Sequence, residues 1–163
     1  MKPGQYIQWQ DLFVIVDDGS IPLVRYQAIE SAMQAHAKQF PSGIALMGIL
    51  PAGATPPPQE VQVAVKEILI RMAPSLSCLS YVVEGSGFKA VAARAALIGM
   101  KIFSSRPYPI YVDISMDEVL RKVLPHLEKG KTVTSDVGVI RKAIADTREQ
   151  WKASPPALSP RAT

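Results

Sequence analysis

The chain contains one cysteine, Cys78, among its 163 residues, and this scarcity excludes several kinds of structure. A single thiol cannot form a disulfide within the chain, and it cannot supply the cysteine ligands of a structural zinc site. This composition agrees with a reducing compartment. Because Cys78 lies within an apolar run, we expect a buried structural thiol, and the sequence predicts neither a metal site nor a cofactor.

Long hydrophobic runs are also missing from the sequence. No stretch reaches the roughly 18 consecutive apolar residues that a membrane-spanning helix needs. The first residues, MKPGQYIQWQDLF, contain no apolar core of a secretion signal. We therefore expect a cytoplasmic protein without a membrane span.

The residues that usually carry catalysis are few and scattered. His36 and His126 are the two histidines, and no neighbouring pattern marks either as the base for a serine or cysteine nucleophile. Asp17 and Asp18 follow a predicted strand, but adjacent residues of an extended strand point to opposite faces, so we favour turn and capping roles over metal binding. The sequence favours a non-catalytic protein, and a small uncharacterised enzyme is an alternative.

Acidic charge is in short supply toward the C-terminal end. The net charge is +4, and from residue 121 onward nine Lys or Arg residues stand against four Asp or Glu residues. A basic C-terminal end can favour binding to nucleic acid. Single-stranded nucleic acid is bound by basic and aromatic residues together, and here the two kinds alternate only around Arg106-Pro107-Tyr108-Pro109. The pattern therefore disfavours nucleic-acid binding and favours a solvated helix with a flexible end.

Short apolar segments alternate with amphipathic stretches along most of the chain. Residues 6–19 are expected to hold one or two strands, the second being Leu12 to Val16, and the further segments expected as strands are 43–50, 77–83 and 108–114. The stretches expected as helices cover about 22–40, 61–73, 88–100, 115–127 and 135–151, with Ser20 expected as the cap of the first. Alternation of this kind predicts an α/β fold with a single, mostly parallel sheet of four or five strands covered by helices.

The expected organisation is an α/β domain over residues 1–130, an appended amphipathic helix over 131–152 and a disordered, Pro/Ser-rich tail over 153–163. The appended helix could dock on its own sheet, on a second copy or on a partner. The residues that would bind a partner are those of its apolar stripe, namely Val137, Ile140, Ile144 and Trp151.

The segment Gly85-Ser86-Gly87-Phe88-Lys89-Ala90 raises the question of an anion site. It matches a glycine-rich turn between a strand and a helix, where backbone N–H groups can bind phosphate. The turn comes late in the chain and has no acidic residue about 20 positions on, so we favour a tight turn. The alternative is a domain that binds a small anionic or apolar ligand with strand-end loops, through Gly85, Ser86, Gly87, Lys89 and Asp18. The small side chains of the alanine-rich helix that follows favour its close packing against the sheet or another helix. The alternative is that this helix forms a self-association face.

The order of elements and the segment SRPYPIYVDISMDEVLRKVLPHL resemble the bacterial STAS-like group, which is related to the anti-sigma-factor antagonists. The resemblance covers about residues 6–128. In that fold the last strand is followed by a helix that begins with a small polar residue and acids, and Ser115, Asp117 and Glu118 stand at this place. The resemblance implies a non-enzymatic regulatory domain whose partner is another protein, with small ligands bound by some looser relatives.

The same resemblance bears on phosphorylation. The antagonists carry a phosphorylatable Ser or Thr after a central strand, and the matching segment here is LPAGATPPPQE. Its one hydroxyl residue is Thr55, which no aspartate precedes and three prolines follow. Thr55 is therefore the candidate phosphorylation site that the resemblance implies, in a context that departs from the family pattern.

Overall fold

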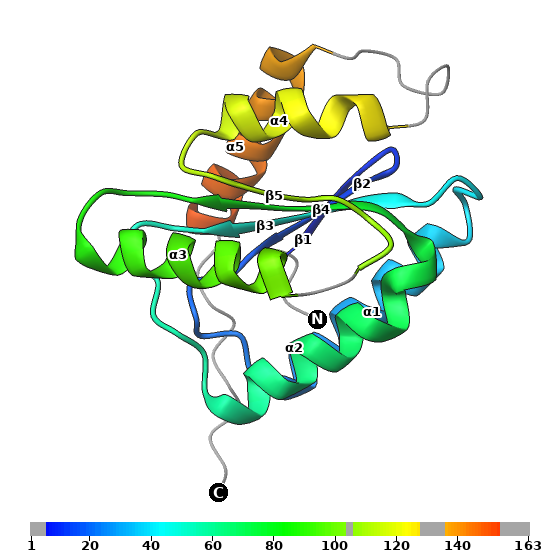
Figure 1. The fold of residues 1–163 in the computed structure, drawn as a ribbon. Helices are drawn as coiled ribbons and strands as arrows, with labels where there is room; N and C mark the ends of the chain where they lie inside the picture. The colour runs from blue at the N-terminus through cyan, green and yellow to red at the C-terminus, as the bar shows by residue number, and fades with distance from the viewer. Residues whose placement is uncertain (1–5, 104–105, 128–135, 154–163) are drawn as a thin grey trace, which may run out of the picture.

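The computed structural model describes residues 6–103, 106–127 and 136–153, and these residues form an α/β architecture (Figure 1). The strands are β1 (Tyr6–Trp9), β2 (Leu12–Val16), β3 (Ile44–Leu50), β4 (Leu76–Val83) and β5 (Ile110–Asp113). The helices are α1 (Leu23–Ala37), α2 (Gln59–Met72), α3 (Phe88–Phe103), α4 (Met116–Val123) and α5 (Val137–Ala153). Two short 3₁₀ turns, Ala73–Ser75 and Leu124–His126, extend α2 and α4.

The strands form one sheet in the order β1-β2-β3-β4-β5. The first two strands are antiparallel, and each later pair is parallel. Trp9 pairs with Leu12, so Gln10 and Asp11 alone make the hairpin turn, and Gln10 has a φ of 54°. The prediction of an α/β fold with a mostly parallel sheet is confirmed.

The central strand β3 is apolar throughout because helices cover both faces of the sheet. Alternate side chains of a strand point to opposite faces. Ile44 and Leu46 accordingly belong to the core on one side, while Ala45, Met47 and Ile49 belong to the core on the other.

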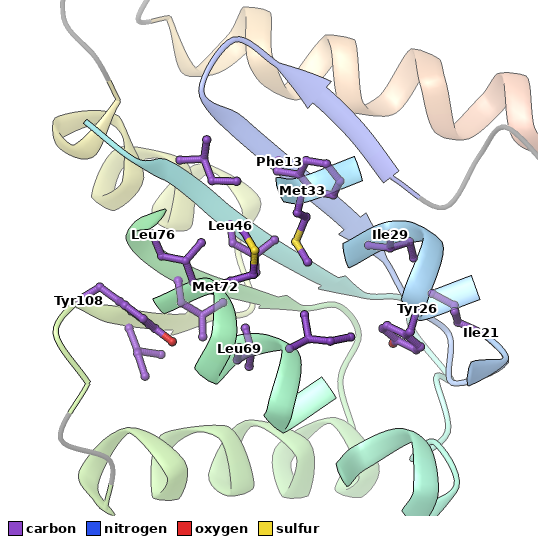
Figure 2. Close-up of a cluster of buried hydrophobic side chains, with 14 of the residues drawn as sticks. Phe13, Ile21, Tyr26, Ile29, Met33, Leu46, Leu69, Met72, Leu76 and Tyr108 are labelled. Carbon is purple, nitrogen blue, oxygen red and sulfur yellow. The ribbon is translucent and has the colours of Figure 1, made fainter. Parts of the chain in front are cut away.

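The first core lies between the sheet and helices α1 and α2 (Figure 2). Phe13 and Leu46 contribute from the strands, Met33 from α1, and Leu69 and Met72 from α2. These helices bury the residues that recur at helical spacing, as the sequence predicts. Figure 1 shows α3 on the same side of the sheet as α1 and α2.

The second core lies under α4 and α5 on the opposite face of the sheet (Figure 1). Ile140 and Ile144 of α5 are buried there, and Val137 and Trp151 pack at its edge. The apolar stripe of α5 therefore docks on the chain's own sheet. Residues 131–135 and 154–163, which the sequence assigns to a helix start and a disordered tail, lie outside the described residues.

The two helix caps expected from the sequence have different outcomes. Ser115 precedes α4, and its hydroxyl accepts a hydrogen bond from the Glu118 N–H at 3.4 Å, so this cap is confirmed. The expected cap by Ser20 is wrong, because α1 begins after Pro22 and has no side-chain cap. The hydroxyl of Ser20 donates instead to the carboxylate of Asp18, because both residues lie within one tight loop.

Candidate functional site

The two carboxylates that follow β2 stabilise a turn. One oxygen of Asp17 accepts the Gly19 N–H at 2.7 Å, and the other accepts the hydroxyl of Tyr26. Asp18 accepts both the backbone N–H and the hydroxyl of Ser20, and these bonds lower the pKa of Asp18. The prediction of turn roles for this pair is confirmed. With its carboxylate bonded inside its own loop, Asp18 gives little support to a ligand site.

The loop after β3 meets this turn at Thr55. The Thr55 N–H donates to the Asp18 carbonyl at 3.1 Å. An added Cβ at Gly19 would lie 1.9 Å from the Thr55 carbonyl oxygen, so the two loops touch through their backbones. Thr55 is an exposed residue, and its phosphorylation stays a prediction.

The glycine turn before α3 has the conformation expected of a tight turn. Gly85 and Gly87 have φ values of +90° and +104°, which non-glycine residues rarely adopt. Arg94 reaches back from α3 to the carbonyl oxygens of Val83 and Gly85, each at 3.4 Å. Lys89 is exposed. Strand β3 separates this turn from the loop after β2, so the structure does not bring Lys89 and the Asp18 loop together through a described contact.

Glu84, which directly follows β4, forms an ion pair with a residue that the sequence did not identify as a partner. Arg148 of α5 donates to both carboxylate oxygens, at 2.6 and 2.8 Å, and this pairing raises the pKa of Arg148. Lys89 and Arg94 are the cations nearest to Glu84 in the sequence. The actual partner is 64 positions away, and only the docking of α5 on the sheet brings it close.

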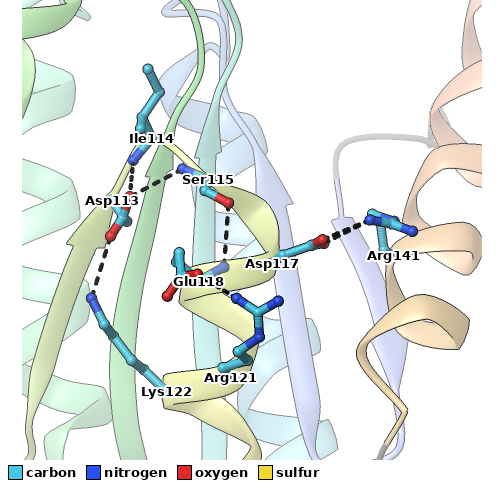
Figure 3. Close-up of polar contacts among 8 residues, drawn as sticks. All are labelled: Asp113, Ile114, Ser115, Asp117, Glu118, Arg121, Lys122 and Arg141. Carbon is cyan, nitrogen blue, oxygen red and sulfur yellow. Dashed lines mark hydrogen bonds and ion pairs between the residues drawn. The ribbon is translucent and has the colours of Figure 1, made fainter.

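Acidic residues around the start of α4 are also used in internal contacts (Figure 3). Asp113 accepts the N–H groups of Ile114 and Ser115, which lowers the pKa of Asp113, and it also pairs with Lys122 at 3.3 Å. Asp117 pairs with Arg141 of α5 at 2.7 Å. The carboxylates near the strand ends thus position loops and helices.

A few ionisable residues are buried near the opposite ends of the strands. His36 is 5% exposed, its Nε2 has no hydrogen-bond partner in the described part of the chain, and burial lowers its pKa. Asp11 is also buried. Burial raises the pKa of Cys78 to about 12, so this thiol stays protonated and unreactive near neutral pH. Within residues 6–103, 106–127 and 136–153, no cluster of His, Cys, Asp or Glu could bind a metal ion.

Helix α3 differs from the other helices in how far its apolar side chains are buried. Helices α1, α2, α4 and α5 each bury apolar side chains. In the part of α3 whose side chains the structure describes, 88–98, no residue is buried. Phe88 is 87% exposed, Val91 is 54% exposed and Ile98 is 44% exposed.

The exposed apolar residues of α3 form one continuous arc. At 100° per residue, Ile98, Val91, Phe88 and three alanines follow one another around the helix. We name this arc the outward face of α3, and it consists of Phe88, Val91, Ala92, Ala95, Ala96 and Ile98. The partly buried residues lie on the other side of the helix, and these are Ala90, Ala93, Arg94 and Leu97. Helix α3 therefore turns an apolar face to solvent, whereas the sequence favoured close packing of this helix.

The comparisons with known proteins add no identification. No family model, no curated protein and no solved structure matches the chain. The STAS-like resemblance therefore stays a prediction. In the described ranges, no helix combines the length and the apolar character needed to cross a bilayer.

Proposed function

We propose that the chain is a non-enzymatic, cytoplasmic regulatory module that acts by binding another protein molecule through the outward face of α3. The observation that carries this proposal is the exposure of Phe88, Val91 and Ile98 on one side of a helix. Burying such a side chain stabilises a complex by about 1.5–3 kcal/mol, whereas leaving it in water contributes nothing. Contiguous apolar surface on a protein commonly marks an interaction site.

The polar residues support a scaffold more than a reaction centre. Asp17, Asp18, Glu84 and Asp113 each bind partners within the chain. The hydrogen bonds lower the pKa of Asp18 and of Asp113, which makes these two carboxylates weaker bases toward a substrate. The proposal also agrees with what the STAS-like resemblance implies, a regulatory domain that binds a protein. A small-ligand site at the strand-end loops has less support, because the loops after β2 and β4 are held by their own contacts.

Site-specific photocrosslinking tests the proposal. Benzoylphenylalanine is placed at Val91 on α3 and, as a matched control, at Val63 on α2, which are 54% and 51% exposed. In cells that produce the full chain, we expect a discrete crosslinked species from position 91 only. Mass spectrometry identifies the captured protein, whether it is the same chain or another one.

A second substitution shows whether the crosslink depends on the outward face. Ala95→Glu places a charge at the centre of this face, and we expect it to abolish the crosslink from position 91. Equal labelling from positions 91 and 63, no labelling from either, or labelling that survives Ala95→Glu would each contradict the proposal.

A further inference from the structure

We infer that the contact between the end of α1 and the β1–β2 hairpin is an acid-sensitive switch, which opens when the imidazole of His36 binds a proton. The switch involves none of the residues of the outward face of α3, and it does not depend on the proposed function. Its effect is local, because acid releases the last turn of α1 while the sheet and the rest of the helix stay in place.

His36 is the middle member of a row of aromatic rings that joins α1 to the hairpin. It is 5% exposed and lies one residue before the end of α1. Its ring centroid is 5.8 Å from that of Phe13 in β2 and 5.0 Å from that of Phe40, which follows the helix. Tyr6 of β1 stacks on Phe13 with the ring centroids 5.0 Å apart. The imidazole is therefore packed among rings that come from both sides of the contact.

The hydrogen-bond partners of His36 suit a neutral imidazole better than a charged one. The backbone of Gln10 is a partner of the ring, whereas Nε2 has none in the described part of the chain. A protonated imidazole carries an N–H on both nitrogens. In the closed contact one of these two donors would be buried without an acceptor, which is unfavourable.

The charges around His36 do not compensate for its burial. Burial lowers the pKa of His36, and it outweighs the opposite effects of the Gln10 backbone and of Asp11, the carboxylate in the hairpin turn. The partial negative charge at the C-terminal end of α1 also favours an imidazolium. Strand β2 and residues 39–43 contain no charged residue, and the nearest charge along α1 is Lys38. A proton on His36 is therefore bound more tightly once the side chain reaches water.

Only the end of α1 has to move for His36 to reach water. The other buried residues of the helix, Tyr26, Ile29 and Met33, all precede it and can stay in the first core. Strand β2 stays paired with β3. Helix ends open at a lower free energy than the strands of a core do. Opening uncovers the ring of Phe13, so acid exposes an apolar surface that is covered near neutral pH.

Hydrogen–deuterium exchange of the purified full chain, followed by mass spectrometry, tests the switch at about pH 7.5 and about pH 5.5. The observed rates are divided by the intrinsic exchange rates at each pH, so that protection factors are compared. We expect the protection of residues 34–43 to fall about tenfold at the lower pH, because His36 in the open state titrates with its ordinary pKa of about 6.5.

The same exchange measured in low concentrations of urea separates local opening from global unfolding. Local opening exposes little surface, so exchange of residues 34–43 should not depend on urea below the unfolding transition. Residues 44–50 of β3 and 76–83 of β4 are the internal reference, because core strands exchange mainly through global unfolding. Their exchange should be slower and should become faster as urea is added.

Two variants assign the effect to His36. His36→Phe keeps a ring in the aromatic row without a titrating group, and we expect the protection of residues 34–43 to become independent of pH. His126→Gln removes the other histidine and should retain the tenfold change.

Three results would each overturn the switch. They are equal protection of residues 34–43 at both pH values, a pH effect that persists in His36→Phe, and exchange of residues 34–43 with the same rate and urea dependence as the two core strands. The urea comparison is made within the wild type, so it decides the question even if His36→Phe does not fold. Photocrosslinking from position 91 is measured separately, so neither result determines the other.

Discussion

At the scale of single residues, Gly19 is held where no other residue fits. Its φ is +88°, and an added Cβ would lie 1.9 Å from the Thr55 carbonyl oxygen. We expect Gly19→Ala to lower the free energy of unfolding by about 3 kcal/mol, the sum of backbone strain and forced separation of two loops. Urea denaturation measures the change.

The matched control for this substitution is Gly53→Ala. Gly53 has a similar φ of +83°, but nothing lies within 4 Å of the added Cβ. Gly53→Ala should therefore lower the free energy of unfolding by about 1 kcal/mol, through backbone strain alone. If Gly53→Ala were as costly as Gly19→Ala, the close approach of the two loops would not contribute to stability.

Buried His36 should make stability depend on pH. Burial lowers the pKa of its imidazole, with the Gln10 backbone and the Asp11 charge acting in the opposite direction. The unfolded chain therefore binds the proton more tightly than the folded chain. The free energy of unfolding should fall as the pH drops below the unfolded pKa of about 6.5.

Urea denaturation at several pH values between about 7.5 and 5.5 measures this effect. The variant His36→Leu should flatten the dependence, because it removes the titrating group from the core. The variant His126→Gln removes the other histidine of the chain and should retain the dependence. An unchanged slope in His36→Leu would assign the pH effect to other groups.

Residue roles could be predicted from the sequence where the interaction is local. The turn roles of Asp17 and Asp18 follow from short-range hydrogen bonds to residues two positions away. The pairing of Glu84 with Arg148 could not be predicted, because it depends on how α5 docks. Local chemistry specifies a turn, whereas a distant ion pair requires the tertiary fold.

At the scale of elements, helix α4 offers a direct test of capping. Ser115→Ala removes the hydroxyl that accepts the Glu118 N–H, and we expect it to lower the free energy of unfolding by about 1 kcal/mol. The control is Ser31→Ala in the middle of α1, where an exposed hydroxyl bonds the Gln27 carbonyl. That change should be neutral or slightly stabilising, because alanine has the higher helix propensity. Equal losses in the two variants, measured in urea, would contradict a specific capping role.

Element types and their order could be predicted because apolar periodicity differs between strands and helices. The direction in which α3 faces could not be predicted in the same way. Its apolar residues occur on several sides of the helix, so its composition is compatible with packing in more than one direction. Only the placement of α3 beside the sheet shows that Phe88, Val91 and Ile98 remain in solvent.

At the scale of the whole molecule, the two buried cores and the proposed interaction surface lie in different parts of the described chain. The sheet is covered by α1 and α2 on one face and by α4 and α5 on the other, and these layers contain the two buried cores. Helix α3 contributes no buried side chain to either core over residues 88–98. Its outward face is therefore free to serve association without weakening the core.

If copies of the chain pair through α3, folding and association are linked by mass action. A partner that binds only the folded state stabilises it, and the effect increases with concentration. The free energy of unfolding of the wild type should therefore rise between about 1 µM and 500 µM protein, by up to about 1.4 kcal/mol per mole of dimer for each tenfold increase above the dissociation constant, and the urea midpoint should rise with it. Val91→Glu should abolish this rise, and Val63→Glu should keep it. A wild-type midpoint that is independent of concentration would show that the exposed face of α3 is not covered by a second copy.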